Sequence, residues 1–378
     1  MLKKAGVNIV NVASNHSTDF GTEGFKKTIK VLNINNINII GNDIKPLIIS
    51  KNNYKVALLS TNLTAFNDSL PINSPEKLCQ CITNFKSAEK TTPLIVYIHF
   101  GTEGRSYPDG KQREIIRQIV CSGADAIIGS HPHTVQNIEY INSTPVFYSL
   151  GNYIFDVDDY CYAVKLTMDK QGIRYSLMPM KIKNCFPKKT DIKESCDFFK
   201  KALINSSIAL KYKNGEFEVF DNRNCDFEDI EKYAFYACNY KVCYINNISE
   251  NKGFMISVDD NISSTRPVVF DGKIYQLKIC DIDNDSIDEI VLGRIKQTRF
   301  SREYLKRVNV YDIENDRLKP FWLGSKFNGD LINFDIEKIS GLNYLKLSVK
   351  YDKSIKTEYY LRDGFGFVKK EIKNNNNL

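Results

Sequence analysis

The sequence predicts an α/β domain followed by a mostly β domain, and three observations lead to this prediction. Apolar runs alternate with helix-like segments over the first 150 residues. Beyond residue 240, short apolar runs separated by turn residues replace this alternation. The length of 378 residues suits two or three domains of about 100–200 residues each. We therefore expect four parts: an α/β domain at 1–185, a helical connector at 186–239, a β-rich module at 240–372 and a disordered tail at 373–378.

Composition narrows the class of protein. Apolar residues make up 42% and charged residues 26% of the chain, which is ordinary for a globular protein. No run approaches the ~18 apolar residues of a membrane helix, so we expect no transmembrane segment. The net charge of +7 comes from scattered basic residues, which argues against a nucleic-acid partner. The first residues, Met1–Gly6, carry no apolar signal-peptide core, so no signal peptide is expected.

The elements of the first domain follow from its apolar patterns. Phe25, Ile29 and Leu32 recur at helical spacing in a segment that Thr22 could cap. A second amphipathic helix is expected at 112–122, before Gly123. Because strand patterns alternate with helical ones, we expect a mainly parallel sheet covered on both faces. Its expected strands are 7–13, 37–40, 55–60, 94–99, 126–129 and 145–150.

The second half has a different pattern. The segments 191–210 and 226–238 are expected to be helical and to form the connector. After them, short strands with turn signals predict an all-β module, either a sandwich or a propeller-like fold. The expected strands are 253–258, 273–279, 289–293, 307–311, 344–351 and 357–361.

The chemistry of the first domain concentrates on its histidines. The chain has four, and all follow the carboxyl ends of predicted strands: His16, His99, His131 and His133. Ligands of open α/β sheets bind outside this edge, and imidazole is a common metal ligand and acid–base group. A purely structural role for all four is therefore the weaker hypothesis. Pro132 favours an extended backbone that would turn His131 and His133 to the same side.

Six motifs in a fixed order resemble the capsule-synthesis CapA family. They are Asn15-His-Ser-Thr-Asp19-Phe-Gly21, His99-Phe-Gly101-Thr-Glu103, Pro108 with Gln112-Arg113, Gly123-Ala-Asp125, Gly129-Ser-His131-Pro-His133 and Tyr148-Ser-Leu-Gly151-Asn152. The resemblance covers about residues 1–185. It implies a calcineurin-like metallophosphoesterase fold and a role in poly-γ-glutamate synthesis.

The resemblance also implies roles for individual residues. Asn15, His99, His131 and His133 would be metal ligands for divalent ions of the Mn, Fe or Zn type. His16 would be catalytic, with Asp19 beside it, and Glu103 and Asn152 would lie at the substrate rim. The reaction would be metal-dependent hydrolysis of a phosphoester or acyl phosphate, with His16 assisting the leaving group.

The opening of the chain departs from the family pattern. The family begins with strands that carry acidic metal ligands, whereas this sequence starts just before Asn15-His16. We therefore expect an N-terminally incomplete domain, in which hydrolase activity depends on those missing ligands. The alternatives are a non-catalytic polymer-synthesis or export component at the surface and a truncated pseudo-enzyme. The partners implied are poly-γ-glutamate or a related anionic polymer, or polymer-synthase proteins, at the cell surface or membrane.

The β-rich module contains an acidic loop. Asp281, Asp283 and Asp285 alternate along the chain, and Glu289 occupies the ninth position. Oxygen ligands in this pattern suit Ca²⁺, and the loop resembles those of FG-GAP and VCBS-type propeller repeats. Ser286 stands where such loops usually have Gly. The alternative is a solvated acidic turn, since Asp and Asn favour turns for their own reasons.

Overall fold

The computed structural model describes residues 1–64, 72–249, 253–260, 263–298, 301–324, 327, 329–364 and 366–372. These residues form two compact units, Met1–Ala202 and Leu203–Leu378, which we describe separately. The expected disordered tail, 373–378, lies outside the described residues. No helix in the described part of the chain is long and apolar enough to cross a membrane.

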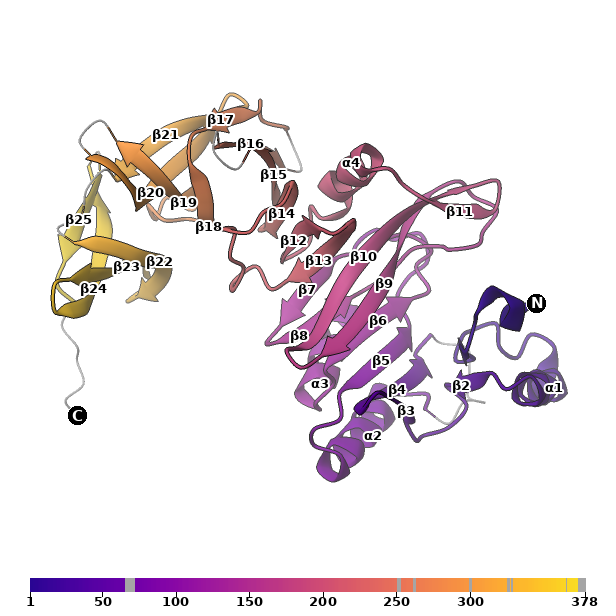
Figure 1. The fold of residues 1–378 in the computed structure, drawn as a ribbon. Helices are drawn as coiled ribbons and strands as arrows, with labels where there is room; N and C mark the ends of the chain where they lie inside the picture. Colours follow the sequence, from indigo (N-terminus) through magenta and orange to yellow (C-terminus); the bar gives the residue numbers. More distant parts are fainter. Residues whose placement is uncertain are drawn as a thin grey trace. The chain divides into compact units, whose positions relative to one another are not determined.

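A six-stranded sheet forms the centre of the first unit (Figure 1). Four neighbouring strands are parallel, and an antiparallel strand flanks them at each edge, which confirms the mainly parallel sheet. The carboxyl ends of the parallel strands therefore meet at one edge. The order is β3 (Leu47–Lys51), β4 (Tyr54–Asn62), β5 (Leu94–His99), β6 (Ala126–Ser130), β8 (Thr144–Phe147) and β7 (Ile138–Ile141).

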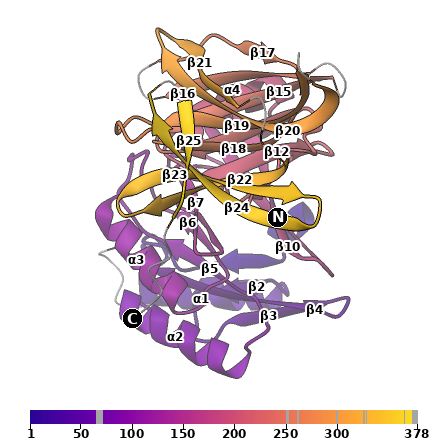
Figure 2. The ribbon, with the colours of Figure 1, turned by 90° about the vertical axis from the view of Figure 1, so that its left-hand side faces the viewer.

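The two faces of this sheet are covered differently. Helices α2 (Pro75–Ala88) and α3 (Gly110–Cys121) lie side by side and pack on one face through a shared apolar core (Figure 2). The opposite face meets antiparallel strands, as the rings of Phe147 and Tyr175 lie 5.9 Å apart. Those strands are β9 (Tyr160–Asp169), β10 (Gly172–Lys183) and β11 (Phe186–Lys189), and helix α4 (Ile192–Ala202) follows them.

A smaller layer carries the start of the chain. After a short 3₁₀ helix (Leu2–Ala5), strands β1 (Ile9–Asn11) and β2 (Asn38–Ile40) form a parallel pair, and helix α1 (Gly21–Ile34) packs on it. Ser60 donates a hydrogen bond of 2.6 Å to Asn11 Oδ1. Thr22 does not cap α1, contrary to our prediction. The helix already begins at Gly21, so Thr22 lies inside it.

The second unit is made of antiparallel strands. Our prediction of a helix at 226–238 is wrong, because strand β14 (Tyr233–Cys238) lies there and pairs along its whole length with β15 (Lys241–Ser249). The predicted helix at 191–210 is confirmed only for α4, and strand β12 (Ile208–Lys213) replaces its last part. The first sheet of the unit has the order β13 (Glu216–Phe220), β12 (Ile208–Lys213), β14 (Tyr233–Cys238), β15 (Lys241–Ser249), β16 (Gly253–Asp260) and β17 (Val268–Phe270).

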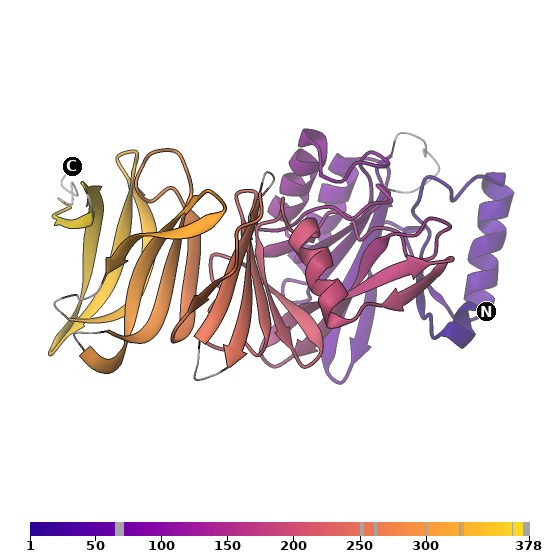
Figure 3. The ribbon, with the colours of Figure 1, turned by 90° about the horizontal axis from the view of Figure 1, so that it is seen from above.

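Two four-stranded meanders follow, and their strands confirm those expected beyond residue 273. The first is β18 (Lys273–Cys280), β19 (Glu289–Thr298), β20 (Ser301–Glu314) and β21 (Arg317–Gly324). The second is β22 (Asp330–Ile339), β23 (Leu342–Tyr351), β24 (Ser354–Asp363) and β25 (Gly366–Lys370). Figure 3 shows these strands in successive layers.

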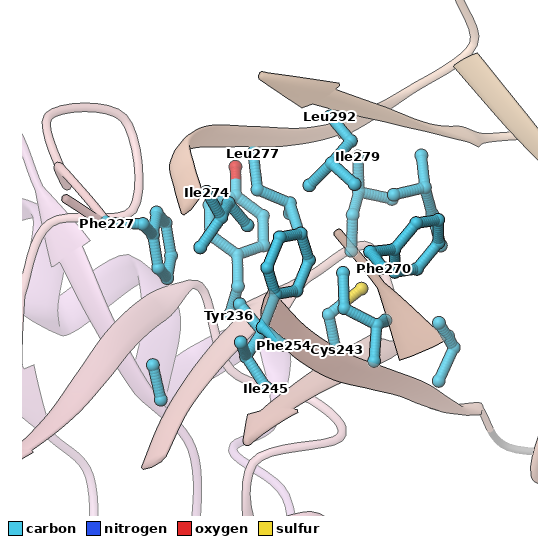
Figure 4. Close-up of a cluster of buried hydrophobic side chains, with 14 of the residues drawn as sticks. Phe227, Tyr236, Cys243, Ile245, Phe254, Phe270, Ile274, Leu277, Ile279 and Leu292 are labelled. Carbon is cyan, nitrogen blue, oxygen red and sulfur yellow. The ribbon is translucent and has the colours of Figure 1, made fainter. Parts of the chain in front are cut away.

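Two apolar cores join the layers of the second unit. In the first, Phe254 and Phe270 pack against Leu277 and Leu292 (Figure 4). In the second, Val308 and Val310 of the first meander pack with side chains of the second, such as Leu345 and Leu347. Tyr311 of β20 lies in the first core, so successive residues of this strand face different cores, as the two-residue period of a strand requires. Stacked antiparallel sheets of this kind are shared by sandwiches and propellers.

Candidate metal centre

The site is built where the chain leaves β5 and β6, neighbours in the six-stranded sheet, and β1 of the small N-terminal layer. His99 is the last residue of β5, whose preceding residues are almost all buried. His131 directly follows β6, and His133 comes two residues later. Asn15 and His16 follow β1. Since β5 and β6 are parallel neighbours, their carboxyl ends bring these side chains to one edge.

The imidazoles lie close together. The ring centres of His99 and His131 are 4.8 Å apart, and those of His131 and His133 are 6.4 Å apart. His16 is near enough to affect the ionisation of both His99 and His131. The structure therefore gathers all four histidines of the chain at one place, although 117 residues separate the first from the last (133 − 16).

A continuous series of polar contacts runs through the site. Ser130 Oγ lies 3.0 Å from His99 Nδ1, and His99 Nε2 lies 2.9 Å from Asn15 Oδ1. The amide oxygen of Asn15 can only accept, so His99 carries its proton on Nε2 and accepts from Ser130 at Nδ1. Asn15 Nδ2 lies 3.4 Å from His16 Nε2, and His16 Nδ1 lies 2.9 Å from Asp19 Oδ2.

The residues in this series of polar contacts have different roles. His16 donates to Asp19 at Nδ1, which leaves its Nε2 lone pair facing the Asn15 amide. The side chain of His16 is 69% exposed, so a ligand can reach it. An exposed imidazole that a carboxylate holds in one tautomer is suited to transferring a proton.

Burial keeps the central histidines neutral. It lowers the pKa of His99 to about 4, and the neighbouring His131, His133 and His16 add to this effect. Burial also lowers the pKa of His131, although the carboxylate of Glu103 opposes the shift. Because metals bind neutral imidazole, both side chains are in the binding form at neutral pH.

The backbone at the His131-Pro132-His133 motif is not extended, which corrects our prediction. His131 has φ 103° and His133 has φ 62°, both in the left-handed region. Pro132 biases its neighbour but does not dictate its conformation, and here the chain turns sharply as β6 ends. Residues held in this region cost free energy and often occur at functional sites.

The outer residues of the site fall into two groups. The predicted rim residue Glu103 has its Oε1 3.9 Å from His131 Nδ1. Together with Asn15 and His131 it lines a cleft of about 520 Å³. Asn152 instead accepts a hydrogen bond of 2.7 Å from His133 Nδ1. It therefore orients the imidazole and leaves Nε2 of His133 free to act as a ligand.

Individual donor atoms of the centre suit a divalent metal, although no three of its histidines, all of them in the described part of the chain, bring a ring nitrogen each within 4.8 Å of one another. Nδ1 of His131 is buried and has no hydrogen-bond partner, which is costly unless a ligand satisfies it. A metal at Nε2 of His99 would displace the proton that this atom shares with Asn15, and the 2.9 Å between Nε2 and Asn15 Oδ1 is a separation that two ligands of one ion about 2.0–2.2 Å away can have. Nitrogen and amide oxygen donors suit ions of the Mn, Fe or Zn type.

Two residues that sequence reasoning missed support the site. Ser130 fixes the tautomer of His99, and Phe155 packs its ring 5.0 Å from that of His133. Ser130 lies inside the Gly129-Ser-His131 motif, so its position was a usable signal. Phe155 gave none, because an apolar residue in a loop has many alternative roles.

The acidic loop connects β18 to β19 in the second unit. Its three aspartates lie together, with ligand oxygens all within 4.8 Å of one another, and no other trio of His, Cys, Asp or Glu in the described parts of the chain does so. Glu289 lies outside this trio. Its Oε2 accepts hydrogen bonds from the amides of Ile282 and Asp283, at 2.9 and 3.4 Å. Burial raises the pKa of Glu289 to about 8, and Asp283 and Asp285 contribute.

The first unit is thus an α/β domain with a histidine-rich polar centre at the carboxyl edge of its sheet. Residues 1–157 match the family described as "Bacterial capsule synthesis protein PGA_cap". This match confirms the resemblance of the first part of the chain to CapA proteins.

Individual relatives agree with the family. The chain is 32% identical over 172 residues to "Capsule biosynthesis protein CapA" of Bacillus anthracis, a match that covers 41% of this chain and 42% of that protein. It is 29% identical over 248 residues to "PGA biosynthesis protein CapA" of Bacillus subtilis, covering 60% of this chain and 64% of that protein. The matches thus span less than two thirds of either relative.

A likeness to a solved structure is weaker. A hypothetical protein from Thermus thermophilus shares 13% sequence identity, with a TM-score of 0.30. The likeness covers 50% of this chain and 75% of that one.

Proposed function

We propose that this chain takes part in capsule biosynthesis, as a component of poly-γ-glutamate production that holds divalent metal at its histidine centre. The family match and the names of both relatives support the biosynthetic role. The observation that carries the metal site is the convergence of His99, His131 and His133 with Asn15 at one sheet edge.

Phosphoester or acyl-phosphate hydrolysis is the chemistry that the site supports best. A bound metal would polarise the phosphoryl oxygen of the substrate. Around it, His16 would donate a proton from Nε2 to a leaving group in its imidazolium form, which the Asp19 carboxylate would stabilise through Nδ1. The cleft beside His131 includes Lys111, whose charge would attract an anionic substrate.

A non-catalytic role is the second candidate, and the charge of the site favours it. Of the predicted site residues, Glu103 is the one whose carboxylate approaches the three ligand histidines, and it stays 3.9 Å from His131. With few carboxylates to balance two cations, the centre would hold metal as an anchor for an anionic polymer or a partner protein at the cell surface.

One experiment separates the two candidates. The full chain, loaded with Mn²⁺, Fe²⁺ or Zn²⁺ in turn, is assayed with p-nitrophenyl phosphate and tested for binding to poly-γ-glutamate. Hydrolysis that is lost in His16→Ala while metal content is kept would support the hydrolase. Metal-dependent polymer binding without turnover would support the anchor. If neither activity depends on metal, the proposal fails.

We also propose a structural Ca²⁺ site at Asp281, Asp283 and Asp285. Their oxygens already converge, and the backbone turns that a calcium loop needs are present, because Ser286 adopts φ 76° where Gly is usual. Arg362 neutralises part of this charge, with Nη1 2.8 Å from Asp283 Oδ2. The affinity should therefore be weak, on the order of 10⁻⁴–10⁻³ M.

A further inference from the structure

Two buried arginines are cross-strand partners inside the second unit. Arg294 of β19 and Arg307 of β20 are direct partners in the antiparallel pair, so their side chains lie on the same face. They are 4% and 6% exposed. Like charges directly opposite each other destabilise a sheet, and burial of the charges makes this worse. Such a pair calls for a compensating anion.

The protein supplies only part of that compensation. Asp271 Oδ1 lies 3.3 Å from Arg294 Nη1 and 3.9 Å from Nζ of Lys296, so one carboxylate is shared between two cations. Within the described residues, no carboxylate lies within 4 Å of Arg307; Asp330 acts on it only from a greater distance. The three basic side chains therefore outnumber their acidic partners.

Arg307 is also unsatisfied as a hydrogen-bond donor. Its Nε is buried and has no hydrogen-bond partner, and Nη1 makes only a 3.4 Å contact with the carbonyl of Lys306. Burial lowers the pKa of both arginines, yet a guanidinium stays charged in proteins. Leaving such a donor unpaired is costly, and an oxyanion would satisfy it.

The neighbouring residues hold the pair in place. Asn309 Oδ1 accepts a hydrogen bond of 2.8 Å from Arg294 Nε, and the guanidinium of Arg294 lies 5.1 Å from the centre of the Phe270 ring. The fork of Arg294 is thus preorganised before any ligand arrives. On the same face, Leu323 of the edge strand β21 is the strand partner of Asn309 and is 49% exposed.

We propose that Arg294, Arg307 and Lys296 form a binding site for an oxyanion, a carboxylate or a phosphate. The site lies outside residues 1–157, which match the family, and is independent of the histidine centre. The planar forks of two arginines favour bidentate contacts with either anion. A carboxylate source would be a glutamate chain, and a phosphate source would be a free phosphate or phosphorylated ligand.

Calorimetric titration of the full chain tests this site. EDTA is present throughout, and His131→Ala serves as a second background, so anions at the histidine centre do not contribute. Inorganic phosphate and tri-γ-glutamate are titrated separately at constant ionic strength. We expect one of them to bind saturably, Arg307→Lys to weaken binding about tenfold, and Arg307→Met to abolish it. Lys319→Met, at an exposed ion pair, should bind like the wild type.

Thermal unfolding without added anion gives an independent readout. Arg307→Met removes an uncompensated buried charge, so its melting temperature should equal or exceed that of the wild type. Phosphate or tri-γ-glutamate should raise the wild-type value and leave that of Arg307→Met unchanged. The site is disproved if neither anion binds, or if Arg307→Met binds as well as the wild type. These results would be the same if the histidine centre bound no metal.

Discussion

The Nε2 atom of His99 lies 2.9 Å from Oδ1 of Asn15, although the two residues are 84 positions apart in the chain. The contact joins the end of a central strand to the loop of the small N-terminal layer. The other end of the Asn15 amide contacts His16, so the Asn15 side chain links His99 to His16. The predictions below follow from this arrangement and from the acidic loop.

Ser130→Ala should weaken metal binding without removing a ligand. Ser130 Oγ contacts Nδ1 of His99 and holds the imidazole in place, and loss of such an outer contact typically lowers metal affinity about 10–100-fold. His99→Ala should lower it further. Both are measured by competition with a chelating dye. Ser87→Ala, at an exposed serine of α2, is the matched control and should bind like the wild type. Equal affinities for Ser130→Ala and the wild type would contradict the assigned role.

Acid should destabilise the metal-free protein through His99. Its folded pKa of about 4 lies below the unfolded value of 6.5, so the unfolded chain takes up the proton first as the pH falls. The contribution is intact above about pH 6.5 and is lost toward pH 4. Between pH 7 and pH 5 the free energy of unfolding should drop by about 2 kcal/mol from this group.

The difference between wild type and His99→Gln isolates this effect. Urea unfolding of both proteins at pH 7 and pH 5, in EDTA, gives the two slopes. His99→Gln should lose about 2 kcal/mol less than the wild type over this interval. Identical losses would show that His99 is accessible to protons in the folded state.

Calcium binding should release a proton at pH 7. The pKa of Glu289 is raised to about 8 by burial and by nearby aspartates, so the folded protein holds this carboxyl largely protonated. A cation at Asp283 and Asp285 would favour its ionised form. Titrations in buffers of different ionisation enthalpy should show about one proton released per ion. Glu289→Gln should abolish the release, whereas binding without proton release in the wild type would refute the coupling.

Ser286→Gly should strengthen the acidic loop. Ser286 has φ 76°, a conformation that costs a residue with a Cβ roughly 1 kcal/mol. We expect a higher calcium affinity and a larger rise in melting temperature with millimolar Ca²⁺ than in the wild type. Asp281→Asn should show no rise. If Ca²⁺ changes the melting temperature of neither the wild type nor Ser286→Gly, the loop is a solvated acidic turn and not a calcium site.

Gly129→Ala should disrupt the strand that carries His131. A Cβ at Gly129 would lie 2.1 Å from the carbonyl oxygen of Tyr148, so the strands β6 and β8 must separate. The free energy of unfolding should fall by about 3 kcal/mol or more, with loss of metal affinity. Gly110→Ala is the control, because its Cβ meets open space. Equal stability of both variants would contradict the close packing behind the site.

Sequence patterns predicted the fold where local periodicity decides structure. The strands ending at His99 and before His131 are continuous apolar runs between polar loops, so both were predicted at nearly their observed bounds. The helix predicted at 226–238 failed because Tyr233–Cys238 is short and aromatic, and its tertiary pairing with β15 outweighs local preference. Thr22 failed because helix α1 begins at Gly21, two residues earlier than a cap at Thr22 requires.

The site was predictable as a set of residues but not as a geometry. Strand ends located the histidines, because parallel strands share one carboxyl edge. The turn at His131 and the contact from Ser130 depend on packing that the sequence does not express. The arginine pair was missed altogether, since cross-strand partners are known only once the register is fixed.

Anomalous X-ray diffraction from crystals grown with MnCl₂ tests the central claim most directly. The account predicts a manganese peak among Asn15, His99 and His131, with ligand distances of about 2.0–2.2 Å, and no such peak in crystals of His131→Ala. A wild-type map with no peak at the histidines, or with manganese only at the loop of Asp281, Asp283 and Asp285, would contradict it.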